Sequence, residues 1–191
     1  IKIYEELMNR DVYRVFDELV DKSKIYNNFI DPFGNDEQAE LDADLFDLVN
    51  VQAASAYTFL LYIFSRHPNL GATAYKEMLQ YFTKWFIRRN LTDYPSTNQL
   101  DAMFMRLIEN IENEEMGVDI RSIHGYLSQR ENMSTIETFK EKLEGDIYEL
   151  NTDMTRFVLS KIEESKQNTR EHRNLWERDK NKLRLKVKNE K

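Results

Sequence analysis

The chain has 191 residues, with 34 acidic and 27 basic side chains and a formal net charge of −7. This length suits one domain, or one domain with an extension, and 41% hydrophobic residues supply enough apolar surface for a core. The lack of cysteine excludes disulfides, thiolate metal sites and cysteine nucleophiles. Only five glycines and three prolines argue against an all-β chain, and no stretch has the roughly 18 uninterrupted apolar residues of a membrane helix.

Apolar residues spaced three and four apart predict a first helix over residues 3–26. After a loop with Pro32 and Gly34, a helical stretch over 37–65, in one piece or two, contains the apolar run 53–64, which is typical of the central helix of a bundle. An amphipathic helix over 72–89 follows. The apolar stripe of the first helix consists of Leu7, Met8, Val12, Val15, Phe16, Leu19 and Val20.

Helix-capping residues mark the second half of the chain. Ser-x-x-Gln at 96–99 and Ser-x-x-Glu at 134–137 are predicted capping boxes, and Asp119 is a predicted N-cap. Gly145 predicts a break before a last helix that opens at Thr152. Seven or eight helices with no strand before residue 180 predict an all-α multi-helix bundle with antiparallel neighbours.

The last 23 residues, 169–191, differ in charge from the rest. They hold nine basic and four acidic residues, a net charge of +5, so the remainder of the chain carries −12. Apolar and basic residues alternate over 183–188, which is a strand pattern, although a lone strand without a partner is expected to be disordered. We therefore divide the chain into a helical bundle domain, 1–168, and a basic extension, 169–191. Because the chain opens without Met and stops inside a charged run, we expect a piece of a longer polypeptide.

Motifs for catalysis and cofactor binding are missing from the chain. The three histidines, His67, His124 and His172, form neither Glu-x-x-His nor His-Glu-x-x-His patterns, and His67 and His124 are expected to be structural or exposed. The five glycines build no phosphate-binding loop. We predict no catalytic residue, metal or cofactor in this chain.

Arg88 and Arg89 are the more informative charged residues. Their spacing from Phe82 and Trp85 turns at least one guanidinium toward the packed side, where it needs a partner such as Asp93, Asp101 or a helix carbonyl. One interpretation is a helix cap with a structural salt bridge. The other is a contact with a phosphate or a neighbouring domain, which suits the guanidinium fork.

The basic tail also allows two interpretations. Arg184, Lys186 and Lys188 alternate with apolar residues and would set a positive strand against nucleic-acid phosphates, or they form the solvent face of an ordinary strand, which we favour. The charge of −12 on the remainder repels nucleic acid, so weak DNA contact is expected from the helical part alone.

A family resemblance appears at the end of the third predicted helical segment. An aromatic helix ends in Arg88-Arg89, a short loop follows, and Thr-Asn at 97–98 opens a helix with Leu100 and Phe104. This pattern resembles the helical region of GmrSD-like restriction endonucleases, prokaryotic defence proteins that cut modified or foreign DNA. The stretches 59–62 and 155–163 are also similar to helices of that family, so the resemblance covers roughly residues 48–164.

The resemblance implies a connecting role for the chain. The family's nucleotide-hydrolysing domain carries an Asp-Gly-Gln-Gln-Arg-like motif and its HNH nuclease domain a Glu-His-Ile-x-Pro motif, and this sequence has neither. Arg88, Arg89 and Asn98 match positions of the helical motif, without an assigned role. The expected function is therefore a helical middle region that couples these two domains and has no catalysis of its own.

This hypothesis carries further expectations. Nucleotide and divalent metal belong to the absent domains, the partners are the flanking domains and, through the parent protein, DNA, and the location is the cytoplasm, with no membrane. The alternative is a free-standing helical adaptor, which would bind a protein partner through aromatic and Met-rich helices such as 82–86 and 103–105.

Overall fold

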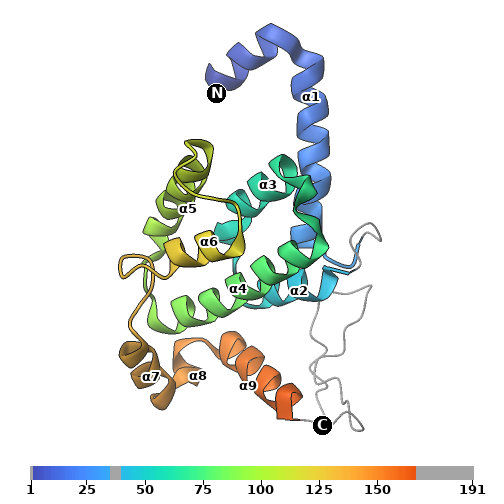
Figure 1. Ribbon diagram of the computed structural model, residues 1–191. Coiled ribbons are helices and arrows are strands. Elements are labelled where there is room, and N and C mark those ends of the chain that lie inside the picture. The colour runs from blue at the N-terminus through green and yellow to red at the C-terminus, as the bar shows by residue number, and fades with distance from the viewer. Residues whose placement is uncertain (1, 35–39, 167–191) are drawn as a thin grey trace.

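The computed structural model describes residues 2–34 and 40–166, and these residues form an all-α bundle with no strand (Figure 1). The all-α prediction is confirmed. Where seven or eight helices are expected, the described residues contain nine, because the break predicted at Gly145 is followed by a separate one-turn helix. The helices are α1 (Lys2–Ile30), α2 (Asp42–Asn50), α3 (Tyr57–Arg66), α4 (Gly71–Thr92), α5 (Thr97–Glu112), α6 (Ile120–Leu127), α7 (Ile136–Glu144), α8 (Ile147–Leu150) and α9 (Thr152–Lys166).

The basic extension lies outside the described residues. The strand predicted over 183–188 and the candidate nucleic-acid contacts Arg184, Lys186 and Lys188 fall in this part, so they stay predictions. The helical stretch predicted over 37–65 is two helices, α2 and α3, separated at Gln52, where the backbone takes a positive φ of 57°.

Helix α4 is the centre of the bundle. It contacts α2, α6, α7 and α9, whereas the more uniformly apolar α3 contacts chiefly α1 and α5. In Figure 1, α4 crosses the molecule, with α7, α8 and α9 on one side of it and α3, α5 and α6 on the other. The central position therefore belongs to α4 and not to the apolar run of α3, because α4 is long enough to be covered along several faces.

Five aromatic rings from three helices fill the core around α4. Phe104 of α5 lies 6.0–6.3 Å, between ring centroids, from Phe82, Trp85 and Phe86 of α4 and from Phe59 of α3. All five side chains are at most 2% exposed. Aromatic pairs at such separations add stabilisation beyond the burial of their area.

Helix α1 leaves the bundle (Figure 1). Its last turns pack against the core through Phe29, whose ring centroid lies 5.4 Å from that of Phe64. Further toward the N-terminus, a kink at Asp11 interrupts the helix, and the Asp11 carboxylate accepts a hydrogen bond from the Arg14 amide at 3.1 Å, as an N-cap does. Of the apolar stripe predicted for this helix, the side chains between residues 12 and 20 are mostly exposed.

Two of the three predicted helix caps are observed. Ser96 and Gln99 form the capping box of α5, and the Asp119 carboxylate accepts from the Ser122 amide at 3.0 Å. The capping box predicted to start at Ser134 is wrong by one residue. Thr135 caps α7 by accepting from the Thr138 amide at 3.2 Å, because Ser134 is engaged by the α4 side chains described below.

Replacing Phe104 with Ala should lower the free energy of unfolding by about 3–5 kcal/mol, because the change removes a ring that four others contact and leaves a cavity. The neighbouring Met105 is 46% exposed, so Met105→Ala should change stability by no more than about 0.5 kcal/mol. Denaturant unfolding of the two variants checks this. Equal stability losses would show that the ring cluster is not the centre of the core.

Candidate functional site

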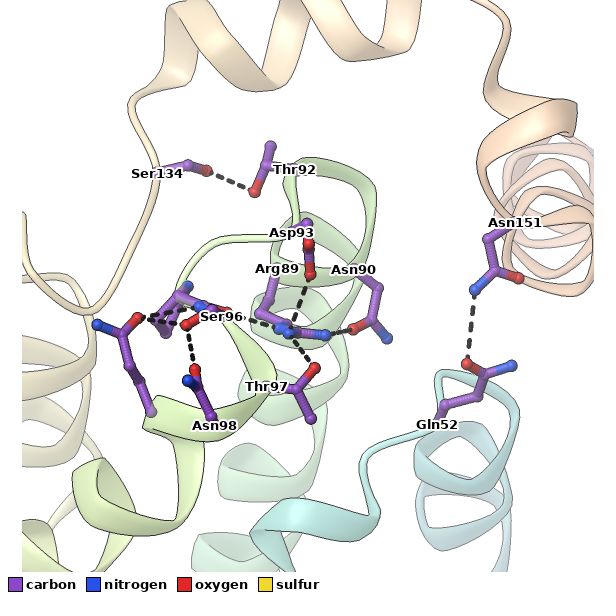
Figure 2. A network of polar contacts seen from close by, with 12 residues as sticks. Gln52, Arg89, Asn90, Thr92, Asp93, Ser96, Thr97, Asn98, Ser134 and Asn151 are labelled. Atoms are coloured by element: carbon purple, nitrogen blue, oxygen red, sulfur yellow. Dashed lines mark hydrogen bonds and ion pairs between the residues drawn. The ribbon is translucent and has the colours of Figure 1, made fainter.

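Arg89 binds the turn between α4 and α5 (Figure 2). Its Nε donates to the Pro95 carbonyl at 2.9 Å, Nη1 to the Asn90 side chain at 2.9 Å, and Nη2 to Asp93 at 3.2 Å and Thr97 at 2.8 Å. The Arg89 side chain is only 11% exposed. The guanidinium is thus paired on all three nitrogens, and Asp93 is one of the partners that the sequence predicts.

The same network reaches α2 through Asn90. The Asn90 amide donates to the Val51 carbonyl at 2.7 Å, so the C-terminal end of α4 is bonded both to the α4–α5 turn and to the end of α2. Burial lowers the pKa of Arg89, and the Asp93 carboxylate opposes this change. Arg89 and its neighbour Asn90 therefore connect α4, the α4–α5 turn and the end of α2.

Asn98 lies at the start of α5, near the Arg89 network (Figure 2). Its side-chain oxygen accepts a hydrogen bond from the Ser96 hydroxyl at 2.6 Å, within the N-terminal turn of the helix. Asn98 is exposed. Asn98 therefore lies beside Thr97, which Arg89 binds, and its side chain bonds to Ser96 and not to Arg89 itself.

Arg88 points elsewhere, toward the segment that connects α6 and α7. Its Nε donates to the Ser134 hydroxyl at 3.3 Å and its Nη2 to the Ser134 carbonyl, while its guanidinium carbon lies 5.8 Å from the centroid of the Phe139 ring. Thr92 also donates to Ser134, at 3.1 Å. Arg88 and Arg89 therefore do not form one site, although they are adjacent in sequence.

A cleft of about 620 Å³ opens beside Arg88, between α4 and the start of α7. Sequence reasoning missed this cleft. Its α4 wall carries Tyr81, Lys84 and Arg88, which share a helix face because they are three and four residues apart. His124 of α6 and Arg130 of the α6–α7 segment also line the cleft. The spacing of the three α4 residues could have shown that they share a helix face. No local sequence pattern shows that Arg130 lies beside that face.

The cleft is positively charged. None of the described residues that line it is acidic, and no carboxylate of the described chain lies within 4 Å of the Lys84 or Arg130 cation. The Tyr81 hydroxyl is buried without a hydrogen-bond partner among the described residues. Burial raises the pKa of Tyr81 to about 12, against a smaller opposing effect of the Arg88 charge.

The two histidines of the described part differ in setting. The His124 ring centroid lies 4.7 Å from that of Tyr81, and the side chain is exposed. His67 ends α3, and its Nε2 lies 3.3 Å from the Tyr62 hydroxyl. Within residues 2–34 and 40–166, no three histidine or carboxylate side chains are grouped so as to hold a metal ion, and no helix is long and apolar enough to cross a membrane. His172 lies outside this part.

Comparison of the chain with protein-family models, with curated proteins and with solved structures finds no match.

Replacing Arg89 with Ala should lower the free energy of unfolding by about 1–3 kcal/mol, because the carbonyl of buried Pro95 and the neighbouring side chains lose their donor. Arg89→Lys should recover only part of the loss, since an ammonium cannot match the guanidinium fork. Arg121→Ala, at an exposed position of α6, is the control. An unchanged melting temperature in Arg89→Ala would show that the Arg89 side chain makes no stabilising contact in the folded protein.

Replacing Tyr81 with Phe should leave stability at pH 7 unchanged or raised, because the buried hydroxyl has no partner to lose. The folded-state pKa of Tyr81 is raised, so its contribution to stability is complete below pH 10 and is lost as the pH rises toward 12. The variant should therefore keep more of its stability than the parent over this range. Thermal unfolding measured at several pH values tests this, and Tyr13→Phe, at an 82% exposed ring, should behave as the parent does.

Proposed function

We propose that this chain is a non-catalytic helical coupling region of a prokaryotic DNA-restriction protein of the GmrSD-like kind. In this role it would join a nucleotide-hydrolysing domain to an HNH nuclease domain. Nucleotide and divalent metal would bind to those domains, and DNA would be reached through the parent protein in the cytoplasm. The observation that carries the coupling role is the exposed apolar face of α1.

This face consists of five residues between the kink at Asp11 and the bundle. Spacings of three, four and seven put them on one side of the helix, and their exposed fractions run from 37% to 82%. Single exposed apolar residues are ordinary, but a continuous apolar strip marks a surface that contacts another protein. The five residues are Val12, Tyr13, Phe16, Leu19 and Val20.

The way α1 is attached supports transmission of movement from this face. Its C-terminal end is anchored among the rings of Tyr57 and Phe64, which belong to α3. Helix α3 in turn contacts α5. A neighbouring domain seated on the exposed face would therefore act on the bundle through a continuous packed connection.

The alternative of a free-standing adaptor draws on the same exposed face. Of the surfaces first expected for it, Phe82, Trp85 and Phe86 are at most 2% exposed and Met103 is 4% exposed, whereas Met105 is 46% exposed. The larger exposed apolar surface for an adaptor is the face of α1. The two functions are thus distinguished by what α1 contacts.

The first test concerns activity. The isolated chain should fold, and it should neither hydrolyse nucleotide nor cleave DNA in the presence of Mg²⁺. Metal-dependent cleavage that a substitution within the bundle abolishes would refute the proposal.

Reading the gene beyond Lys191 separates the two functions: a Glu-His-Ile-x-Pro motif within a few tens of codons supports coupling, and a stop codon there favours the adaptor.

The second part of the test is made in the longer polypeptide, with the double variant Phe16→Ser/Leu19→Ser. Nucleotide hydrolysis should persist while nucleotide-dependent DNA cleavage falls at least tenfold. The matched control is Glu18→Ser/Asp21→Ser on the opposite side of α1, where the surface ion pairs contribute little. Cleavage that is unaffected by the apolar double variant would remove α1 from the coupling role.

A further inference from the structure

We propose that the cleft between α4 and the start of α7 binds the phosphate group of a small phosphate monoester. This inference does not depend on the proposed function, because it rests on the side chains that line the cleft. It assigns a ligand chemistry to a place that the coupling role does not use.

The first support is charge. Lys84, Arg88 and Arg130 all line the cleft, and no carboxylate of the described chain pairs with Lys84 or Arg130. Like charges that converge in a shared cleft repel one another, and an anion between them removes this repulsion. The whole chain carries −7, so a cleft lined by three Lys and Arg residues and by no described carboxylate differs from the average surface.

The second support is the set of free donors. Tyr81 lines the cleft and its hydroxyl has no acceptor among the described residues, but the hydroxyl is buried, so it becomes a donor to a ligand only when the side chain turns toward the cleft. Arg88 uses Nε and Nη2 on Ser134, which leaves the N–H groups of Nη1 available. Thr135 and Ile136, at the first turn of α7, also line the cleft, and a helix start presents amide N–H groups that have no acceptor within the helix.

The third support is shape. A volume of about 620 Å³ exceeds the need of a bare phosphate ion and falls in the usual range for small organic ligands, about 300–1,000 Å³. Trp85 and the adjacent rings of Tyr81 and His124 supply an aromatic side for the organic part. A phosphate monoester satisfies both the charged and the aromatic side, because it carries close to two negative charges at neutral pH.

The same walls would hold in place a ligand that enters. Trp85 Nε1 donates to the Leu127 carbonyl at 3.2 Å, and Arg88 and Thr92 both donate to Ser134, so α4 is bonded to the end of α6 and to the α6–α7 segment, which also line the cleft. A preformed site loses less conformational freedom on binding than one that must be ordered. The cleft is therefore built before the ligand arrives.

The test is calorimetric titration of the isolated chain with phenyl phosphate and with inorganic phosphate. Lys84→Gln/Arg130→Gln should weaken phenyl phosphate binding at least tenfold. The control, Lys76→Gln/Arg121→Gln, removes the same charge at exposed positions outside the cleft and should leave affinity unchanged. An equal loss in both double variants, or no saturable binding at millimolar phenyl phosphate, would overturn the site.

Tyr81→Phe separates binding from folding, because it should weaken binding while the melting temperature is kept or raised. Unchanged affinity in this variant would remove the hydroxyl from the site and overturn the proposed donor set.

A nucleic-acid source of the phosphate is distinguished with two short single-stranded oligonucleotides of one sequence, with and without a 5′-phosphate. Selective binding of the phosphorylated strand supports a monoester site, whereas equal binding of both would assign the cleft to the nucleic-acid backbone and overturn the monoester.

Discussion

The bundle depends on the packing of aromatic rings from α3 and α5 against α4. Phe59, Phe82 and Phe104 lie nearly parallel to one another, and Trp85 adds an edge contact while its indole nitrogen binds the Leu127 carbonyl of α6. One helix face thus organises three other helices. The side of α4 that carries Tyr81, Lys84 and Arg88 is then free to hold groups that do not stabilise the core. The rings already supply the buried area that holds the helix in place.

Helix positions were predictable from the sequence because a period of 3.6 in apolar residues reports which face is buried, whatever the partner is. The same period does not report what covers that face. The stripe of α1 was read correctly as apolar, yet Phe16 is 65% exposed. Likewise the uniformly apolar α3 was expected at the centre. The central position belongs instead to the longer α4. Which helix is central depends on how all the helices pack together, and this does not follow from the apolar pattern of one helix.

The candidate residues show the same division between local and tertiary causes. The partner of Arg89, Asp93, was predictable because it lies four residues further along the chain, directly after the end of α4 and within side-chain reach. The Ser134 cap was mispredicted because the choice between Ser134 and Thr135 is made by Arg88, 46 residues away in sequence. The cleft was missed for this reason as well. One wall is a helix face that can be read from spacing, but the other is brought by a segment with no periodic pattern.

The cleft also differs energetically from the rest of the bundle. Elsewhere the buried polar groups mostly find partners, as Arg89 and Asn90 do, and such pairing is what a sequence selected for stability alone would supply. Two buried polar side-chain atoms of the described residues have no partner, Asn28 Oδ1 and the Tyr81 hydroxyl, and Tyr81 lines the cleft together with three basic side chains. Departures from local stability that gather at one preformed place are expected where function has set the residues. This concentration, more than any one of its members, distinguishes the cleft from an ordinary surface depression.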